Sequence, residues 1–361
     1  MLKFLNLEPE IFAIDINDSS LKIIKLIKKR KGFSLVSFND VKIKQGVIKE
    51  GIIQDKEALA NIIKKACNTV KGKKLGTKYA IISLPEEKSF SRLIQMPKMT
   101  AEELKLALPF EAGNYIPLAI DNAYLDFQII NSPQDNLTHL DLLINAMPKS
   151  IIDNYVSCCK NAGLIPCILE VESQAVARAL LKNGENIPPV ILIDLGYNST
   201  SFIIFSNGSV RFTSSIPVSS QQLTNAISDS LGINLHEAET LKIKHGLGKK
   251  EHYNIDKAIT PILNDLVIQI KKYIDFYHSH STNEYFKSDG KIEKIILSGG
   301  GANLKNISNF LSKELKIPVE LGNPLVNIIL PKKNKFSDEN ILSFTTALGL
   351  ALRGASEKLY D

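Results

Sequence analysis

The sequence predicts an α/β protein of two domains, and three observations lead to this prediction. The chain has 361 residues, which exceeds one typical domain, so two hydrophobic cores are expected. Short apolar runs alternate with segments that have helical spacing of apolar residues, a pattern typical of α/β folds. The third observation is a strand, aspartate, turn and strand pattern that occurs twice, half a chain apart.

The composition limits the classes of function. Hydrophobic residues make up 44% and charged residues 23% of the chain, which is ordinary globular usage and argues against general disorder. The net charge is +6, but the basic residues are scattered apart from two short runs, so nucleic acid is not an expected partner. No apolar run approaches the roughly 20 residues that span a bilayer, and no signal peptide opens the chain. We therefore expect a cytoplasmic protein.

The cysteines indicate a reducing environment. They have neither CxxC spacing nor the arrangement of a disulfide framework, and Cys158 and Cys159 lie on an apolar helical stripe. Buried, reduced thiols that pack as small hydrophobic side chains are therefore expected. The four positions are Cys67, Cys158, Cys159 and Cys167.

The repeated unit is a strand, an aspartate, a small polar turn and a second strand. The first copy spans residues 11–27, with Asp15 after its first strand. The second copy spans residues 190–205, with Asp194 at the same place. A single unit of this kind is often a plain β-hairpin with an Asx turn. Two copies at equivalent places in the two halves favour a shared function.

The turns of both hairpins carry groups suited to phosphate. Small residues let backbone N–H groups converge on an anion, and hydroxyl groups add further donors. The amine of Lys22 can reach a phosphate as a point charge. An aspartate at each strand end can position hydrated Mg²⁺, so Asp15 and Asp194 are the candidate metal-positioning residues, acting through water. The candidate phosphate-binding residues are Asn17, Asp18, Ser19, Ser20 and Lys22 in the first hairpin and Gly196, Asn198, Ser199, Thr200 and Ser201 in the second.

A glycine-rich turn follows a third apolar strand, at residues 295–297. Gly299, Gly300 and Gly301 precede Asn303 and a segment with helical spacing, which is how a backbone approaches a ligand just before a helix N-terminus. The turn is not GxGxxG and the chain has no Walker sequence, so Rossmann and P-loop folds are weak alternatives. Three glycines alone are often only a turn, but their place after two aspartate hairpins makes them more specific.

These three elements together resemble the actin-like ATPase superfamily, which includes actin, sugar kinases, DnaK-type chaperones and FtsA. The resemblance implies a nucleotide cleft between the two halves, where the hairpins hold the phosphates of ATP with Mg²⁺ and the glycine turn lies beside the adenosine. It also implies that Glu172 positions the attacking water, with Gln174 as the rival, and that Glu239 and Lys242 hold the nucleoside. A charge pair on one helix face explains the last two residues equally well.

Within the superfamily, the sequence is most similar to the PilM family of type IV pilus assembly proteins. The string from Arg92 through Met96-Pro97 to Tyr115-Ile116-Pro117 looks like the small subdomain that PilM inserts into its first domain. The segment 347–354 is similar to the PilM C-terminal helix. The insert is expected to be a strand-helix-strand-strand (SHS2) unit with elements at 90–96, 101–114, 124–130 and 137–146.

The resemblance also implies domain boundaries. The first actin-like domain is expected at 1–165, with the insert at about 87–150. The second is expected at 166–361, with a C-terminal helix at about 341–355 that returns toward the first domain.

Three positions depart from the family pattern. Asn17 replaces the usual glycine of the first hairpin, and its side chain can crowd a phosphate. Ser219 and Ser220 stand where the family commonly has paired glycines. Pro109 falls inside the expected insert helix, so it must lie at a kink or in a new first turn. The first two departures weigh against fast hydrolysis, so we expect nucleotide binding with slow turnover at most.

The function implied by the resemblance is that of an ATP-binding component of the inner-membrane platform of type IV pili or a related secretion system. Its partner would be the cytoplasmic N-terminal tail of a PilN-type membrane protein, bound in a nucleotide-responsive way, so its membrane contact would be indirect. Pilus ATPases and other platform proteins are further candidate partners.

Two alternatives remain open. One is a division or filament-forming ATPase of the FtsA or MreB kind, although residues 356–361 lack the amphipathic stripe of the FtsA membrane helix. The other is a sugar kinase of the same fold. The small insert argues against a kinase, and no carboxylate is evident for activating a sugar hydroxyl.

Overall fold

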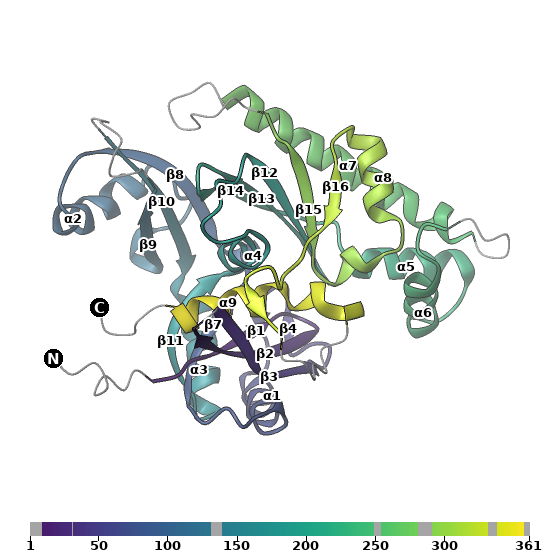
Figure 1. The fold of residues 1–361 in the computed structure, drawn as a ribbon, viewed down its shortest axis with the longest axis horizontal. Coiled ribbons are helices and arrows are strands. Elements are labelled where there is room, and N and C mark those ends of the chain that lie inside the picture. Colours follow the sequence, from purple (N-terminus) through teal and green to yellow (C-terminus); the bar gives the residue numbers. More distant parts are fainter. Residues whose placement is uncertain are drawn as a thin grey trace. The chain divides into compact units, whose positions relative to one another are not determined.

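The computed structural model describes residues 9–30, 32–130, 139–248, 254–280, 291–330 and 338–356. The chain forms two compact units, whose elements are labelled in Figure 1. Unit 1 contains Met1–Lys88, Ser150–Gly184 and Asn323–Asp361, and unit 2 contains Ser89–Lys149 and Glu185–Gly322.

Unit 1 is built on a mixed sheet. Its strands are β1 (Phe12–Ile16), β2 (Ser20–Lys29), β3 (Gly32–Lys42), β6 (Lys71–Gly72), β7 (Tyr79–Leu84), β11 (Ile165–Val171) and β17 (Ile328–Ile329), and a separate short hairpin pairs β4 (Ile48–Lys49) with β5 (Ile52–Ile53). The sheet order is β11-β7-β1-β2-β3-β17, with β6 also paired to β3. β1 is buried along its whole length, which is why it is continuously apolar apart from Asp15.

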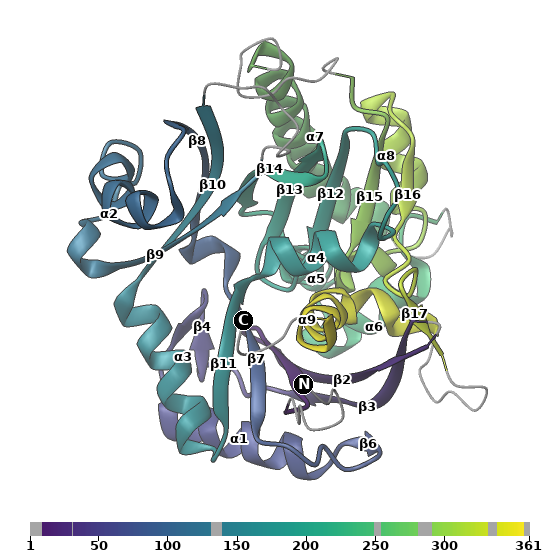
Figure 2. The same cartoon turned by 60° about the vertical axis from the view of Figure 1, so that its left-hand side comes forward.

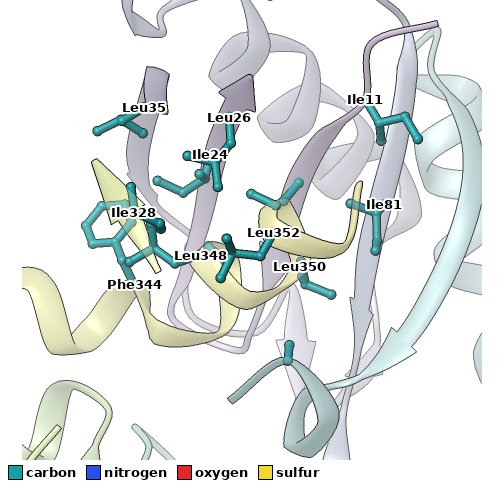
Figure 3. Packing of buried hydrophobic residues seen from close by; sticks show 14 residues of the cluster. Ile11, Ile24, Leu26, Leu35, Ile81, Ile328, Phe344, Leu348, Leu350 and Leu352 are labelled. Carbon is teal, nitrogen blue, oxygen red and sulfur yellow. The ribbon is translucent and has the colours of Figure 1, made fainter. Parts of the chain in front are cut away.

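The described part of unit 1 contains four α-helices, and one of them forms the centre of its core. They are α1 (Lys56–Asn68), α3 (Lys149–Asn161), α4 (Glu172–Leu180) and α9 (Thr345–Ser356). Figure 3 shows Leu348, Leu350 and Leu352 of α9 packed among Ile24 of β2 and Ile81 of β7. The expected C-terminal helix therefore packs on the sheet that carries the first aspartate hairpin.

Unit 2 contains a five-stranded sheet and its helices. The strands are β12 (Val190–Leu195), β13 (Thr200–Ser206), β14 (Ser209–Ile216), β15 (Lys294–Ser298) and β16 (Val319–Leu321), and the helices are α5 (Ser220–Leu231), α6 (Leu235–His245), α7 (Ile255–His280) and α8 (Ile307–Leu315). The strand order is β14-β13-β12-β15-β16. Tyr273 of α7 stacks on Phe202 of β13 with ring centroids 4.9 Å apart. Aromatic contacts thus fix α7 on the sheet.

The insert has the expected order of strand, helix, strand and strand. Its elements are β8 (Phe90–Pro97), α2 (Ala101–Ala112), β9 (Ala123–Ile129) and β10 (His139–Pro148), and the predicted start of the last strand, 137–138, lies outside the described residues. The antiparallel sheet has the order β8-β10-β9, and α2 covers one face of it (Figure 2) through Leu104 and Leu108. The helix begins after Thr100, which caps it in a capping box with Glu103, and continues through Pro109 to Ala112, so no new first turn forms at Pro109.

The two units do not follow the expected boundary at residue 165. β11 pairs in parallel with β7, so residues 166–184 group with unit 1, as do residues 323–361 through α9. The insert, residues 89–149, groups with unit 2 because β8 packs against β14. Such long-range contacts leave no local signal in the sequence. Within the described ranges, no helix combines the length and apolar character needed to cross a bilayer.

Candidate functional site

The two hairpin aspartates occupy equivalent positions in the two sheets. Asp15 in β1 lies opposite Lys22 in β2, and Asp194 in β12 lies opposite Ser201 in β13. In each hairpin the aspartate therefore faces the residue seven positions further along the chain. The repeat seen in the sequence is thus also a repeat in strand register.

A serine on the next parallel strand accompanies each aspartate. The hydroxyl of Ser298 in β15 donates a hydrogen bond to Oδ1 of Asp194 over 2.6 Å. Ser83 in β7 hydrogen-bonds the Asp15 carboxyl, and its hydroxyl accepts the backbone N–H of Ile16 over 2.9 Å. Neither serine was predicted from the sequence. The two share one feature, because Ser298 is the last residue of an apolar strand and Ser83 is the second to last residue of another.

Asp15 lies in an environment that disfavours its charge. Its side chain is 4% exposed, and burial raises the pKa of its carboxyl, while Lys22 and then Ser83 partly lower it. Its Oδ1 atom has no hydrogen-bond partner in the described part of the chain. A buried carboxylate oxygen without a donor costs free energy, and water bound to a metal ion is a donor that would satisfy it. This residue therefore fits an outer-sphere role toward Mg²⁺.

The turn of the first hairpin directs its donors at one side chain. The backbone N–H groups of Ser19 and Ser20 donate to Oδ1 of Asn17 over 3.1 and 2.9 Å. Asp18 faces elsewhere, since its carboxylate accepts the backbone N–H groups of Glu50 and Gly51 over 2.6 and 3.0 Å. Asp18 therefore links the hairpin to the β4–β5 turn. Its carboxylate does not join the other groups that the sequence predicts to bind phosphate.

The amine of Lys22 lies beside the same turn. It donates to the hydroxyl of Ser20 over 2.6 Å and lies 5.9 Å from the ring centroid of Phe344. The structure therefore brings Asp15, Lys22 and Ser20 together in one hairpin.

The second turn is held by the N-terminus of α5. The N–H groups of Ser220 and Gln221 donate to the carbonyls of Gly196 and Tyr197 over 3.1 and 3.0 Å. Ser219 is the N-cap of this helix, in a capping box with Gln222. The serine pair that replaces the family glycines therefore caps α5 and anchors the turn.

The polar side chains of the second hairpin differ in burial and in their hydrogen-bond partners. The hydroxyl of Thr200 is buried and donates to the carbonyl of Val218 over 2.6 Å. Ser201 is also buried, whereas Asn198 is exposed and Ser199 is half-buried. The hydroxyl of Thr200 therefore has a structural partner, while Asn198 and Ser199 lie at the accessible end of the turn.

The glycine turn packs directly on the end of β12. Gly299 has a φ of +84°, and a Cβ at this position would lie 2.5 Å from the carbonyl oxygen of Leu195, so only glycine fits. Gly300 to Asn303 form a 3-10 helix, in which Asn303 donates to the carbonyl of Gly300 over 3.2 Å. α8 begins only at Ile307, so the helix N-terminus expected directly after the glycines lies further along the chain.

Lys242 and Glu239 form an ion pair that ties α6 to α5. The amine of Lys242 lies 2.7 Å from Oε2 of Glu239, 2.8 Å from the hydroxyl of Ser220 and 2.7 Å from that of Thr224. Burial lowers the pKa of Lys242, and Glu239 opposes that effect. The pair thus has a structural role between two helices, while the Glu239 side chain stays 44% exposed.

Glu172 is the first residue of α4 and shares its surroundings with Asp15. Its Oε2 lies 3.5 Å from the backbone N of Glu86. Burial, followed by the charges of Glu172, Glu87, Asp18 and Asp15, raises the pKa of Tyr155 well above its usual value. The rival, Gln174, has a buried Nε2 without a partner among the described residues. Both side chains therefore remain candidates for positioning water.

The predicted residues form two clusters, one in each compact unit. Unit 1 brings together the first hairpin, Ser83 and Glu172, and unit 2 brings together the second hairpin, Ser298 and the glycine turn. In the described ranges, no group of three His, Cys, Asp or Glu side chains is arranged to hold a metal ion.

The family comparison covers almost the whole chain. The sequence profile of a family described as type IV pilus assembly protein PilM matches residues 13–355. Among solved structures, a chain of a PilM–PilN type IV pilus biogenesis complex is similar with a TM-score of 0.82 and 24% identity, over 96% of this chain and 99% of that one. A structure of MreB5 from Spiroplasma citri bound to AMPPNP is similar with a TM-score of 0.55 and 14% identity, over 96% of each chain.

Curated relatives are cell division proteins. FtsA from Neisseria meningitidis serogroup B is 24% identical over 96% of this chain and 78% of its own length. FtsA from Buchnera aphidicola subsp. Baizongia pistaciae is 26% identical over 60% of this chain, and the match spans only 56% of that relative. The likeness to the solved structures confirms the predicted actin-like α/β fold.

Proposed function

The chain belongs to the PilM family of type IV pilus assembly proteins, and from this premise we propose that it is a nucleotide-binding scaffold of the pilus assembly platform. In this role it binds Mg·ATP and the cytoplasmic tail of a PilN-type membrane protein, through which it is held at the inner membrane. Pilus ATPases and other platform proteins are further proposed partners.

One observation carries the proposal for nucleotide. Each half has an aspartate at the same register position, with a serine from the next parallel strand beside it. We assign Asp15 and Asp194 to the waters of Mg²⁺, and Lys22, Ser19, Ser20 and Ser199 to the phosphate oxygens. When bound, Mg²⁺ would neutralise part of the phosphate charge. The MreB5 structure with AMPPNP supports the proposal through the shared fold.

The test is the magnesium dependence of ATP binding, measured by calorimetry with Mg²⁺ and with a chelator. The variant Asp194→Ala should fold normally and lose the magnesium dependence. The matched control is Asp229→Ala, an exposed aspartate on α5 in the same unit, which should bind Mg·ATP as the wild type does. Equal Mg·ATP binding by wild type and Asp194→Ala would contradict the assignment.

We propose that turnover is slow, so that nucleotide is a structural ligand more than a fuel. Catalysis needs donors preorganised around the transition state, whereas Thr200 and the turn donors at Asn17 already have protein partners. Glu172→Gln should reduce the remaining hydrolysis without weakening ATP binding. Turnover near the roughly 10 s⁻¹ typical of enzymes would contradict the scaffold role and favour an enzyme.

The proposed partner site is on the insert, along the outer edge of its sheet. β9 is the outer strand of the insert sheet, and no other described strand pairs with its free edge. Tyr124 and Ile129 on this strand are large and exposed. An extended tail with alternating apolar side chains can add to such an edge by backbone pairing, with side chains in shallow pockets.

A labelled peptide with the sequence of the PilN-type tail tests this site. Replacing Ile129 with Lys should weaken tail binding at least about tenfold, because a charge would enter the apolar contact. The matched control is Leu106→Lys, which changes an equally apolar, exposed residue on the outer side of α2. Equal tail affinity of both variants and the wild type would place the partner elsewhere. If the protein binds the tail with equal affinity in the presence and absence of Mg·ATP, nucleotide does not regulate tail binding.

A filament-forming function is the second candidate, because the similarity to Neisseria FtsA extends over 96% of this chain. Sedimentation of the protein with Mg·ATP separates the two functions. A polymer that pellets only with nucleotide would favour the filament. Protein that stays in the supernatant with and without nucleotide would favour the scaffold.

A further inference from the structure

Four hydrogen-bond donors of the first hairpin turn meet a single oxygen atom, Oδ1 of Asn17. The backbone N–H groups of Ser19 and Ser20 lie 3.1 and 2.9 Å from it. The hydroxyl groups of the same two serines lie 3.2 and 3.3 Å from it. These are the donors that the sequence assigns to phosphate. An oxygen of the protein itself therefore lies at the point where they converge.

The second hairpin provides an internal comparison. Gly196 stands two residues after Asp194, as Asn17 stands two residues after Asp15. Both turns contain the same backbone hydrogen bond, from Asn17 N–H to the Ser20 carbonyl over 3.0 Å and from Gly196 N–H to the Ser199 carbonyl over 2.9 Å. The first turn therefore has an internal acceptor at a position where the second turn has no side chain.

The internal acceptor is weaker than the ligand it resembles. An amide oxygen is neutral and has two lone pairs, so it cannot satisfy four donors fully. A phosphate oxygen carries negative charge and forms shorter, stronger hydrogen bonds with the same groups. Phosphate can therefore displace the Asn17 side chain, but only after losing the hydrogen bonds that the side chain now accepts.

The displacement would also affect Lys22. The Ser20 hydroxyl, which lies near Asn17, accepts a hydrogen bond from the Lys22 amine over 2.6 Å. Lys22 is 6% exposed and is the cation nearest in register to Asp15. A hydrogen-bond network thus connects the Asn17 side chain, the Ser20 hydroxyl and the Lys22 amine beside the buried carboxylate of Asp15.

We infer that the Asn17 side chain is an internal ligand of the first hairpin, which occupies the place of a phosphate oxygen and rotates away when a polyphosphate nucleotide binds. Asn17 is then a specificity-determining residue that lowers affinity for the phosphate part of the nucleotide and leaves affinity for the nucleoside unchanged. This inference rests on the proposed nucleotide binding, and it identifies the hydrogen bonds that are lost when the phosphate binds.

The experiment compares wild type, Asn17→Gly and Asn17→Asp by calorimetry with Mg·ATP and with adenosine. Asn17→Gly removes the internal acceptor, so it should bind Mg·ATP about tenfold more tightly, with unchanged adenosine binding. Asn17→Asp keeps an acceptor and adds a negative charge that repels phosphate, so it should bind Mg·ATP more weakly than the wild type. The reverse exchange at Gly196 is not useful, because a Cβ there would lie 2.6 Å from the Ser199 carbonyl oxygen.

A second measurement needs no nucleotide. Amide hydrogen exchange at Ser19 and Ser20 should be faster in Asn17→Gly than in the wild type, at equal melting temperature, because the two N–H groups lose their acceptor. Unchanged exchange at both amides would overturn the internal-ligand inference.

The outcomes separate the inference from the proposed function. If the wild type binds Mg·ATP and Asn17→Gly binds it equally or more weakly, the inference is overturned and nucleotide binding stands. If Asn17→Gly gains the same factor for adenosine as for Mg·ATP, the effect does not come from phosphate and the inference is again overturned. If neither protein binds Mg·ATP or adenosine, both the proposed function and the inference are overturned.

Discussion

At the scale of single residues, buried charge is the main feature of the hairpin in unit 1. Asp15 is held in a strand that is otherwise apolar, and burial raises the pKa of its carboxyl above 3.8 despite the nearby amine of Lys22. The native state therefore binds the Asp15 proton more tightly than the unfolded chain does. By linkage, the stability that Asp15 contributes is fully present below about pH 3.8 and is lost as pH rises through the raised pKa.

The variant Asp15→Asn should remove this dependence. Relative to the wild type, its free energy of unfolding should increase as pH rises from about 3.8 and level off above the native pKa of Asp15. Urea unfolding without nucleotide, repeated across this pH range, measures the difference. Asp229→Asn, at an exposed position, is the control and should give a constant difference. A constant difference for Asp15→Asn as well would contradict the raised pKa.

At the scale of elements, the contact between α9 and α4 depends on one glycine. A Cβ on Gly349 would lie 1.8 Å from the carbonyl oxygen of Ala175 and 2.9 Å from its Cα. The two helices therefore meet backbone to backbone at this point. Any side chain here would push α9 away from the sheet on which it packs through Leu348, Leu350 and Leu352.

Gly349→Ala should destabilise the protein by about 3 kcal/mol, because the overpacked atom meets rigid backbone. The matched control is Gly354→Ala in the same helix, where a Cβ would meet only side-chain atoms of Ile11 and Ile81 at 3.3–3.4 Å. We expect a change of about 1 kcal/mol or less there, since alanine favours the helix. Urea denaturation of both variants checks the difference, and equal stability would contradict the close approach.

At the scale of the whole molecule, the insert groups with the sheet of unit 2, where β8 packs against β14 and a carboxylate of the insert acts on an arginine of the sheet. Asp141 of β10 accepts a hydrogen bond from Gln95 over 3.0 Å. Burial lowers the pKa of Arg211 in β14, and Asp141 is the first group that opposes this effect. Both residues are buried, so solvent screens their charges less than it screens exposed charges.

A double-mutant cycle with Asp141→Asn and Arg211→Met should give a coupling free energy of about 1–3 kcal/mol, because the Asp141 carboxylate favours the buried charge of Arg211. The control cycle uses Lys294 and Glu320, an ion pair of 2.6 Å in the same unit whose side chains are 39% and 53% exposed. Its coupling should be at most about 1 kcal/mol. Equal coupling in both cycles would show that Asp141 and Arg211 do not fix the insert.

Features that depend on neighbours along the chain could be predicted from the sequence. The two hairpins with Asp15 and Asp194, the glycine turn and the order of elements in the insert follow from periodicity and turn chemistry within about thirty residues. Cys158 and Cys159 are buried, as their place on an apolar helical stripe predicts. Family membership followed from the same local strings, which is why it was recognisable before the fold was seen.

Contacts across parallel strands could not be predicted from the sequence and became known from the fold. Ser83 reaches the first hairpin from 67 positions away and Ser298 reaches Asp194 from 104 positions away, and parallel pairing leaves no local pattern to show it. The fold also gives the Thr200 hydroxyl its acceptor, the carbonyl of Val218. In the first turn it places Oδ1 of Asn17 where the N–H groups of Ser19 and Ser20 donate to it. A side chain's hydrogen-bond partner depends on positions in space, and the sequence specifies those positions only through the whole fold.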